Sequence, residues 1–104
     1  MDNMEQLQAV VNEVQAARQQ VANLRAQVVE LEATVDAVSN QPEDLGLHQQ
    51  MGGVLVEVSD RDALLKDLEQ TLLTLNEHLA RFTEREAQLM ATYEELQAVL
   101  KGTE

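Results

Sequence analysis

The residues of this chain that could do chemistry are few and scattered. His48 and His78 are the only histidines, and the absence of cysteine excludes disulfides and thiolate metal sites. The sequence places no second histidine and no converging set of carboxylates near either one. We therefore interpret both histidines as surface or packing residues rather than metal ligands or catalytic bases.

Three aspartates lie close enough in sequence to suggest a calcium site. Asp60, Asp62 and Asp67 lack the loop glycine and the terminal glutamate of an EF-hand, and they lie where a helix is predicted to begin. Helix capping explains them better, with Ser59 as the N-cap and Asp62 completing a capping-box-like S-x-x-D. No nucleophile lies beside a base, so we expect no enzyme activity, no cofactor and no metal.

A glycine pair marks the only segment with a period of two. Gly52-Gly53 lacks the Lys-Ser/Thr that would follow in a phosphate-binding loop, and it separates two β-prone runs, which predicts a hairpin. With a two-residue turn, one face of this hairpin is apolar apart from Gln49, and its members are Leu47, Met51, Val54, Val56 and Val58. Because an isolated hairpin is marginally stable, we predict that this face is an assembly surface.

Long heptad patterns flank the hairpin on both sides. One runs from Leu7 to Val38, and the other runs from Leu65 to Leu100 with Glu86 as its one polar member. The patterns predict a mainly α fold, a long antiparallel two-helix coiled coil with one β-hairpin at the connection. We expect a single domain over residues 1–104, with helices at about 4–39 and 60–101 and the hairpin at about 46–58.

The two patterns align if the chain reverses at the hairpin. In the register that uses both helices fully, Ala17 faces Glu86, and Arg18 is the candidate partner of that carboxylate. Two interpretations stay open. The facing pair of Ala17 and Glu86 is either a weak point of the coiled coil, at which the helix ends can open, or a tolerated polar position without a role. As a weak point, Glu86 would be paired with Arg18 or exposed by local opening.

Apolar residues lie beside the heptad positions near both chain ends. They are either ordinary helix residues that fill or widen the heptad face for a neighbouring helix, or, together with heptad residues beside them, an apolar patch that binds other proteins. The residues of this predicted patch are Met4, Leu7, Val10, Val11, Tyr93, Leu96, Val99 and Leu100.

Composition narrows the classes of partner. A net charge of −12 leaves no basic face for phosphates, so nucleic acid is not an expected partner. The apolar runs are too short for a signal peptide or a membrane span, and we expect a cytoplasmic protein. The acidic, lysine-poor surface fits either a high-salt cytoplasm or an ordinary acidic coiled coil.

Several segments together resemble the β-type subunits of prefoldin. They are Pro42 with Glu43-Asp44, the run L-H-Q-Q-M-G-G-V-L-V-E-V from Leu47, the helix start S-D-R-D from Ser59, and T-E-R-E-A-Q-L from Thr83. The family commonly has an aromatic residue where this chain has His48. The α-type subunits carry two hairpins, and only one fits here, which favours the β type.

The resemblance implies a function. Prefoldins are hexamers of two α-type and four β-type subunits whose hairpins join into an intersubunit β-barrel. Their coiled-coil tips, here the apolar patch near the chain ends, hold unfolded client proteins without ATP and pass them to a group II chaperonin. Two other classes stay open: a structural coiled-coil adaptor, and a prefoldin-like protein that assembles with itself into a filament or ring.

Overall fold

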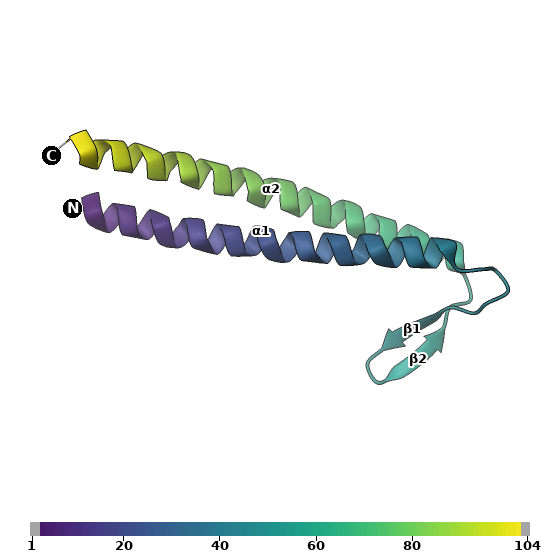
Figure 1. The fold of residues 1–104 in the computed structure, drawn as a ribbon. Coiled ribbons are helices and arrows are strands. Elements are labelled where there is room, and N and C mark those ends of the chain that lie inside the picture. Colours follow the sequence, from purple (N-terminus) through teal and green to yellow (C-terminus); the bar gives the residue numbers. More distant parts are fainter. Residues whose placement is uncertain (1–2, 103–104) are drawn as a thin grey trace. The chain divides into compact units, whose positions relative to one another are not determined.

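The computed structural model describes residues 3–102 and consists of two long helices with a β-hairpin between them in sequence (Figure 1). Helix α1 spans Asn3–Asn40, strands β1 and β2 span His48–Met51 and Val54–Glu57, and helix α2 spans Arg61–Gly102. This element order confirms the predicted fold class. Each helix end lies one residue from the position expected from the sequence. That the whole chain forms one domain stays a prediction.

The described residues fall into two compact units. The first, which we call the terminal unit, contains residues 3–25 and 77–102, and the second, the hairpin unit, contains residues 26–76. In each unit a segment of α1 packs against a segment of α2 through the predicted heptad positions. Neither helix holds an apolar stretch, over the described part of the chain, that could span a bilayer.

The core of the terminal unit is a line of small α1 residues covered by larger α2 residues. Val14, Ala17 and Val21 are buried, and Ala17 is the most completely covered at 2% exposure. Helix α2 has no fully buried residue, and its heptad members here, such as Leu89 and Phe82, are half-buried. Small side chains on one helix let the larger ones of its neighbour lie close, so a two-helix unit can exclude water along one line.

The hairpin unit has a thinner core. Val28 is its one buried residue among those described, and the remaining heptad positions of both helix segments are half-buried. Helix α1 ends at Asn40 because Pro42 disfavours a helical conformation for the preceding residue. The chain then turns, and the amide of Leu45 donates to the carbonyl of Pro42 at 3.0 Å.

Helix α2 begins with an aspartate cap. The Ala63 amide donates to Asp60 Oδ1 at 3.1 Å, and the Leu64 amide donates to the Asp60 carbonyl at 3.2 Å. Asp60 is therefore the N-cap, and the prediction of Ser59 was wrong by one residue. A carboxylate has a charge that favours the positive end of the helix, which a serine hydroxyl lacks.

Arg61 ties the start of α2 to the end of α1. Its Nη1 donates to the carbonyl of Gln41, and its Nη2 donates to the carbonyl of Pro42 at 3.1 Å. Carbonyls at and just beyond a helix C-terminus have no partner within the helix, so a guanidinium with several fixed donors satisfies two of them at once. The half-buried Arg61 side chain thereby holds the connection from which the hairpin leaves.

The hairpin has the predicted register. Met51 pairs with Val54 and Gln49 with Val56, and the Val58 amide extends the ladder by donating to the Leu47 carbonyl at 2.9 Å. Gly52 has a φ of 62°, and Gly53 does not have a positive φ, which matches a type II′ turn. A residue with a Cβ is strained at the first of these positions, which explains the glycine there.

Candidate functional site

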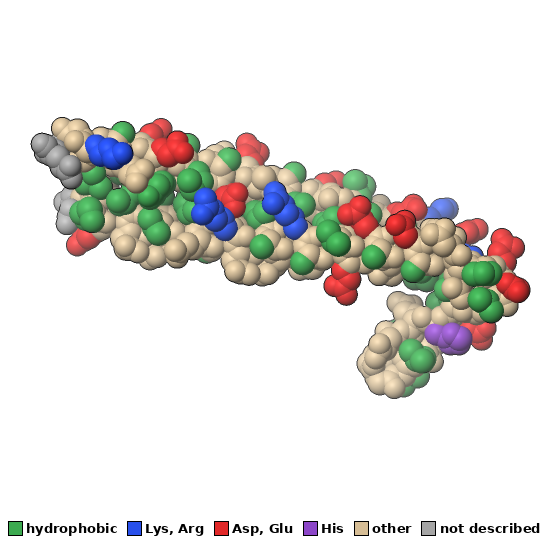
Figure 2. Space-filling model, in the orientation of Figure 1, with side chains coloured by type: hydrophobic (Ala, Val, Ile, Leu, Met, Phe, Trp, Pro, Cys, Tyr) green, Lys and Arg blue, Asp and Glu red, His purple; other side chains and the backbone are tan. Residues whose placement is uncertain are grey.

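The hairpin presents apolar side chains directly to solvent. All eight residues of the two strands are exposed, including Met51, Val54 and Val56 of the predicted assembly face. Leu47 and Val58, at the base of that face, are half-buried. Figure 2 shows hydrophobic side chains uncovered on the hairpin and on the loop beside it. Three apolar side chains on one exposed face, without a covering layer in the described chain, mark a binding surface.

Both long edges of the hairpin are open. The sheet has two strands, and in an antiparallel pair the hydrogen-bonded and non-hydrogen-bonded positions alternate. Since Leu47 and Val58 form a bonded position, the backbone groups of Gln50 and Leu55 point outward. An exposed edge with free amides and carbonyls is a template for a further strand. The hairpin can therefore extend its sheet on either side.

The opposite face of the hairpin carries one apolar residue that was not among the residues predicted to form the assembly surface. Leu55 is 68% exposed, and Leu45, in the loop before β1, is also exposed. The run V-L-V in β2 places apolar side chains on both faces, and this signal could have identified Leu55. The central part of the hairpin therefore exposes apolar side chains on both of its faces.

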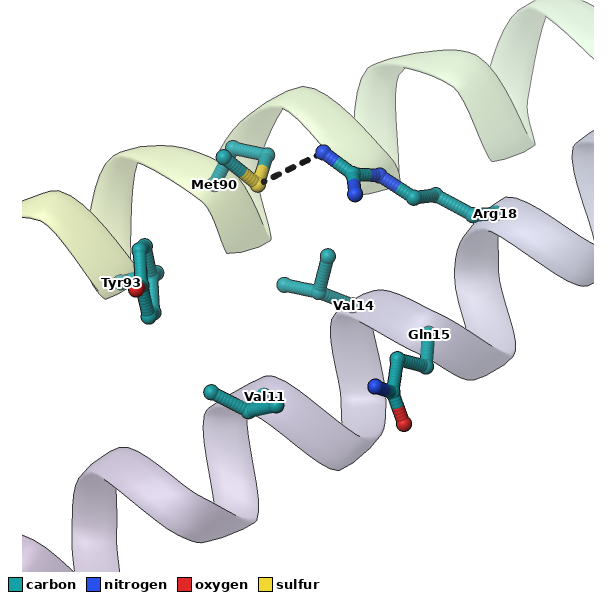
Figure 3. Close-up of a pocket in the computed structure, with 6 residues that line it drawn as sticks. All are labelled: Val11, Val14, Gln15, Arg18, Met90 and Tyr93. Atoms are coloured by element: carbon teal, nitrogen blue, oxygen red, sulfur yellow. Dashed lines mark hydrogen bonds between the residues drawn. The ribbon is translucent and has the colours of Figure 1, made fainter.

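A second candidate surface is a shallow groove in the terminal unit, shown in Figure 3. It has a volume of about 200 Å³ and is formed by two segments far apart in sequence. Its lining residues are Val11, Val14, Gln15 and Arg18 from α1, and Met90 and Tyr93 from α2. Apolar and polar side chains line the groove together, a composition typical of sites that accept an apolar side chain with a few polar contacts.

Polar contacts fix two of the groove residues. Arg18 Nη2 lies 3.5 Å from Met90 Sδ, so the guanidinium reaches across from α1 to α2. The Tyr93 hydroxyl accepts a hydrogen bond of 2.9 Å from Gln97 Nε2, one turn further along α2. These contacts restrict the side chains of Arg18 and Tyr93, which both line the groove.

The polar layer of the terminal unit is paired. Arg18 Nε lies 4.0 Å from Glu86 Oε1, with side chains 60% and 27% exposed. Of the interpretations left open for Glu86, the structure shows pairing with Arg18. It does not show a gap at Ala17, which is buried. A pair this long and this exposed contributes little to stability.

The structure places the predicted client-binding residues in one unit but exposes few of them. Met4 is 58% exposed and Val99 49%. The others are half-buried, and they are Leu7, Val10, Val11, Tyr93, Leu96 and Leu100. The groove brings Val11 and Tyr93 together with Gln15 and Arg18. Neither Gln15 nor Arg18 was predicted from the sequence to belong to a binding surface.

No group of three or more histidine, aspartate or glutamate side chains is placed to hold a metal ion among residues 3–102. His48 is exposed on β1, and His78 is half-buried on α2. The features that remain are an exposed apolar hairpin and a grooved two-helix unit. They are typical of a coiled-coil protein that contacts other proteins.

The comparisons with known proteins agree with this class. The family model described as "Prefoldin subunit" matches residues 1–103, and the chain belongs to this family. Its members are chaperone subunits rather than enzymes, and they assemble with other prefoldin subunits into hetero-oligomers. No curated protein sequence matches the chain.

Two solved structures share the fold. One is the prefoldin beta subunit from Thermococcus strain KS-1, with a TM-score of 0.88 and 21% identity over 97% of this chain and 88% of that one. The other is the prefoldin beta2 subunit from the same strain, with a TM-score of 0.76 and 17% identity over 90% of this chain and 99% of that one. These likenesses confirm the helix–hairpin–helix architecture.

Proposed function

We propose that this chain is a β-type subunit of an ATP-independent holdase, which binds unfolded proteins and delivers them to a group II chaperonin. The observation that carries the proposal is the hairpin, whose apolar strands are exposed on both sides within a chain of the prefoldin family. A subunit made for assembly needs such a surface, and a protein that functions alone has no use for it. The proposed location is the cytoplasm.

Assembly is proposed to occur through strand addition. Hairpins of neighbouring subunits would extend the sheet at the open edges of β1 and β2 and close it into an intersubunit β-barrel. Leu47, Met51, Val54, Val56 and Val58 would then face a common apolar core. The proposed assembly contains two α-type and four β-type subunits.

Client binding is proposed to occur on the terminal unit. The groove and the exposed side chains of Met4 and Val99 offer apolar area that an unfolded chain can cover with its own apolar residues. Such burial is non-directional, so it tolerates many client sequences. No nucleotide is required, because release can follow from competition by the chaperonin.

The proposal is tested by light scattering of a chemically denatured client that is diluted into buffer without ATP. The chain, assembled with an α-type partner subunit, is expected to suppress aggregation at ratios near one assembly per client. Mass measurement with and without that partner determines the stoichiometry. Unchanged client aggregation in the presence of a fully formed assembly would contradict holdase activity.

One observation favours a second candidate function, a coiled-coil adaptor that joins fixed partners. Val29 on α1 and Leu73 on α2 are apolar, exposed and outside the heptad contacts of the hairpin unit. An adaptor would bind a folded partner through these outer faces. A holdase binds only the denatured form of a protein, so a client presented in folded and denatured forms distinguishes the two functions.

A further inference from the structure

One methionine of the terminal unit lies against a cation of the neighbouring helix. Met90 on α2 is half-buried, and its Sδ lies 3.5 Å from Nη2 of Arg18 on α1 (Figure 3). A thioether sulfur is only a weak hydrogen-bond acceptor, so the guanidinium gains little from this contact. Arg18 is nevertheless placed where a stronger acceptor on the same sulfur would meet a donor.

The guanidinium has separate donors for two partners on α2. Arg18 Nε lies 4.0 Å from Glu86 Oε1, whereas Nη2 faces Met90, about one helical turn further along α2. Because these N–H groups belong to one planar fork, Arg18 can contact the carboxylate and the methionine together. The carboxylate therefore helps to keep the guanidinium beside the sulfur.

The methionine is accessible to small molecules. Met90 lines the groove of about 200 Å³, and Arg18 beside it is 60% exposed. A molecule of the size of hydrogen peroxide can enter a groove of this volume. Gln15 also lines the groove, but its amide points away from the sulfur in Figure 3, whereas the Arg18 guanidinium points toward it.

We propose that Met90 is a site of reversible oxidation, and that Arg18 binds the resulting sulfoxide and thereby ties α1 to α2. A peroxide is the oxidant. The sulfur lone pair attacks a peroxide oxygen, the O–O bond breaks, and a sulfur–oxygen bond forms while hydrogen peroxide is reduced to water. Methionine sulfoxide reductases restore the thioether, with oxidation of a dithiol to a disulfide and release of the oxygen as water.

The added oxygen changes a weak contact into a strong one. A sulfoxide oxygen carries a large partial negative charge, so its hydrogen bond from a guanidinium is charge-assisted. Methionine oxidation ordinarily destabilises a packed region, because a polar group enters it without a partner. At Met90 the donor is already in place on the opposite helix, so oxidation should make the helices of the terminal unit harder to separate.

Two substitutions imitate the two oxidation states. Met90→Gln places an amide oxygen on a side chain of similar length, whereas Met90→Leu keeps an apolar side chain of similar size. Each is made in the full chain, with Arg18 and with Arg18→Ala. Hydrogen exchange of the amides of residues 5–16 and 87–98 reports how easily the helices separate. This measurement requires no client and no partner subunit, so its outcome does not depend on holdase activity.

With Arg18 present, we expect the Met90→Gln amides to exchange about threefold more slowly than the Met90→Leu amides, because a charge-assisted bond joins the helices. With Arg18→Ala, the Met90→Gln amides should exchange as fast as those of Met90→Leu, or faster. Equal or faster exchange of Met90→Gln with Arg18 present would overturn the assignment of Arg18 as the sulfoxide partner. An equal slowing without Arg18 would overturn it as well.

Peroxide treatment tests the modification itself. In the wild-type chain, peptide mass spectrometry compares oxidation of Met90 with that of Met4, which is 58% exposed. A chain with Met4→Leu and Met51→Leu then gives the effect of the Met90 sulfoxide on exchange, and any oxidation of Met1 is common to the Arg18 and Arg18→Ala backgrounds. We expect slower exchange only with Arg18, and reductase treatment should reverse it. A Met90 that stays reduced while Met4 is fully oxidised, or a sulfoxide that the reductases leave in place, would contradict a reversible site.

Discussion

Arg18 on α1 and Glu86 on α2 form a long, largely exposed ion pair, with 4.0 Å between Nε and Oε1, at the one polar heptad position of α2. The buried Ala17 precedes Arg18 in sequence and has the smallest side chain among the buried residues of α1. The pair therefore adds little apolar burial to the terminal unit. We predict that the ends of the two helices separate more easily for this reason.

Replacing Glu86 by leucine should stabilise the protein. The position is 27% exposed, so an apolar side chain there would be mostly covered, and the free energy of unfolding should rise by about 1–2 kcal/mol. Arg18→Ala should lower it by no more than about 0.5 kcal/mol, because exposed pairs contribute little. Urea denaturation measures both. Glu84→Leu, at an exposed position of α2, is the control and should change stability little; a destabilised Glu86→Leu protein would show that the pair matters more than burial.

The weak pair of Arg18 and Glu86 leads us to predict where the two helices separate first. Amide hydrogens of residues 5–16 and 87–98 should exchange faster than those of residues 24–38 and 65–79, because local opening costs least where apolar burial is interrupted. Glu86→Leu should narrow the difference. Hydrogen exchange followed by mass spectrometry measures it. Uniform protection along both helices, or a difference that Glu86→Leu leaves unchanged, would leave Glu86 as a tolerated polar residue without a role.

The cap of α2 gives a matched pair of variants. Asp60→Ala removes the acceptor of the Ala63 amide and should lower the free energy of unfolding by about 1 kcal/mol. Ser59→Ala, one residue earlier, should have little effect. Thermal denaturation of both proteins under one buffer condition compares them. Equal losses would mean that both side chains support the helix start.

The helical architecture was predictable because the heptad pattern repeats many times. Each of the heptad positions from Leu7 to Val38 is buried or half-buried, and a pattern of that length determines which face packs. The hairpin register followed from Gly52-Gly53 and the alternation around it. The cap was misassigned by one residue because Ser59 and Asp60 are both good N-cap residues, and only the backbone path distinguishes them.

The candidate surfaces were less predictable. The V-L-V run indicates that Leu55 lies on the opposite face from Val54 and Val56, but the sequence of a two-stranded sheet does not determine that both faces stay uncovered. The groove depends on the reach of Arg18 across to Met90, a contact between residues 72 positions apart.

Client binding should be lost when apolar side chains of the terminal unit are removed. Deleting residues 1–11 and 93–104 should abolish suppression of client aggregation while assembly survives, because the hairpin unit is untouched. A gentler variant, Met4→Ser with Val99→Ser, should weaken suppression several-fold. Its control is Val29→Ser with Leu73→Ser, which removes exposed apolar side chains of the hairpin unit. Full activity in the truncated protein would assign client binding to the hairpin unit.

The most direct test of the account is the mass of the assembly formed by a Val56→Asp variant. Val56 lies at the centre of the apolar hairpin face, and a carboxylate there would be buried without a partner if hairpins join into a barrel. With an α-type partner subunit present, we predict that sedimentation shows small species for the variant and a large hetero-oligomer for wild type. Circular dichroism should show equal helical content in both. A variant that forms the wild-type assembly would contradict the claim that the hairpin is the assembly element.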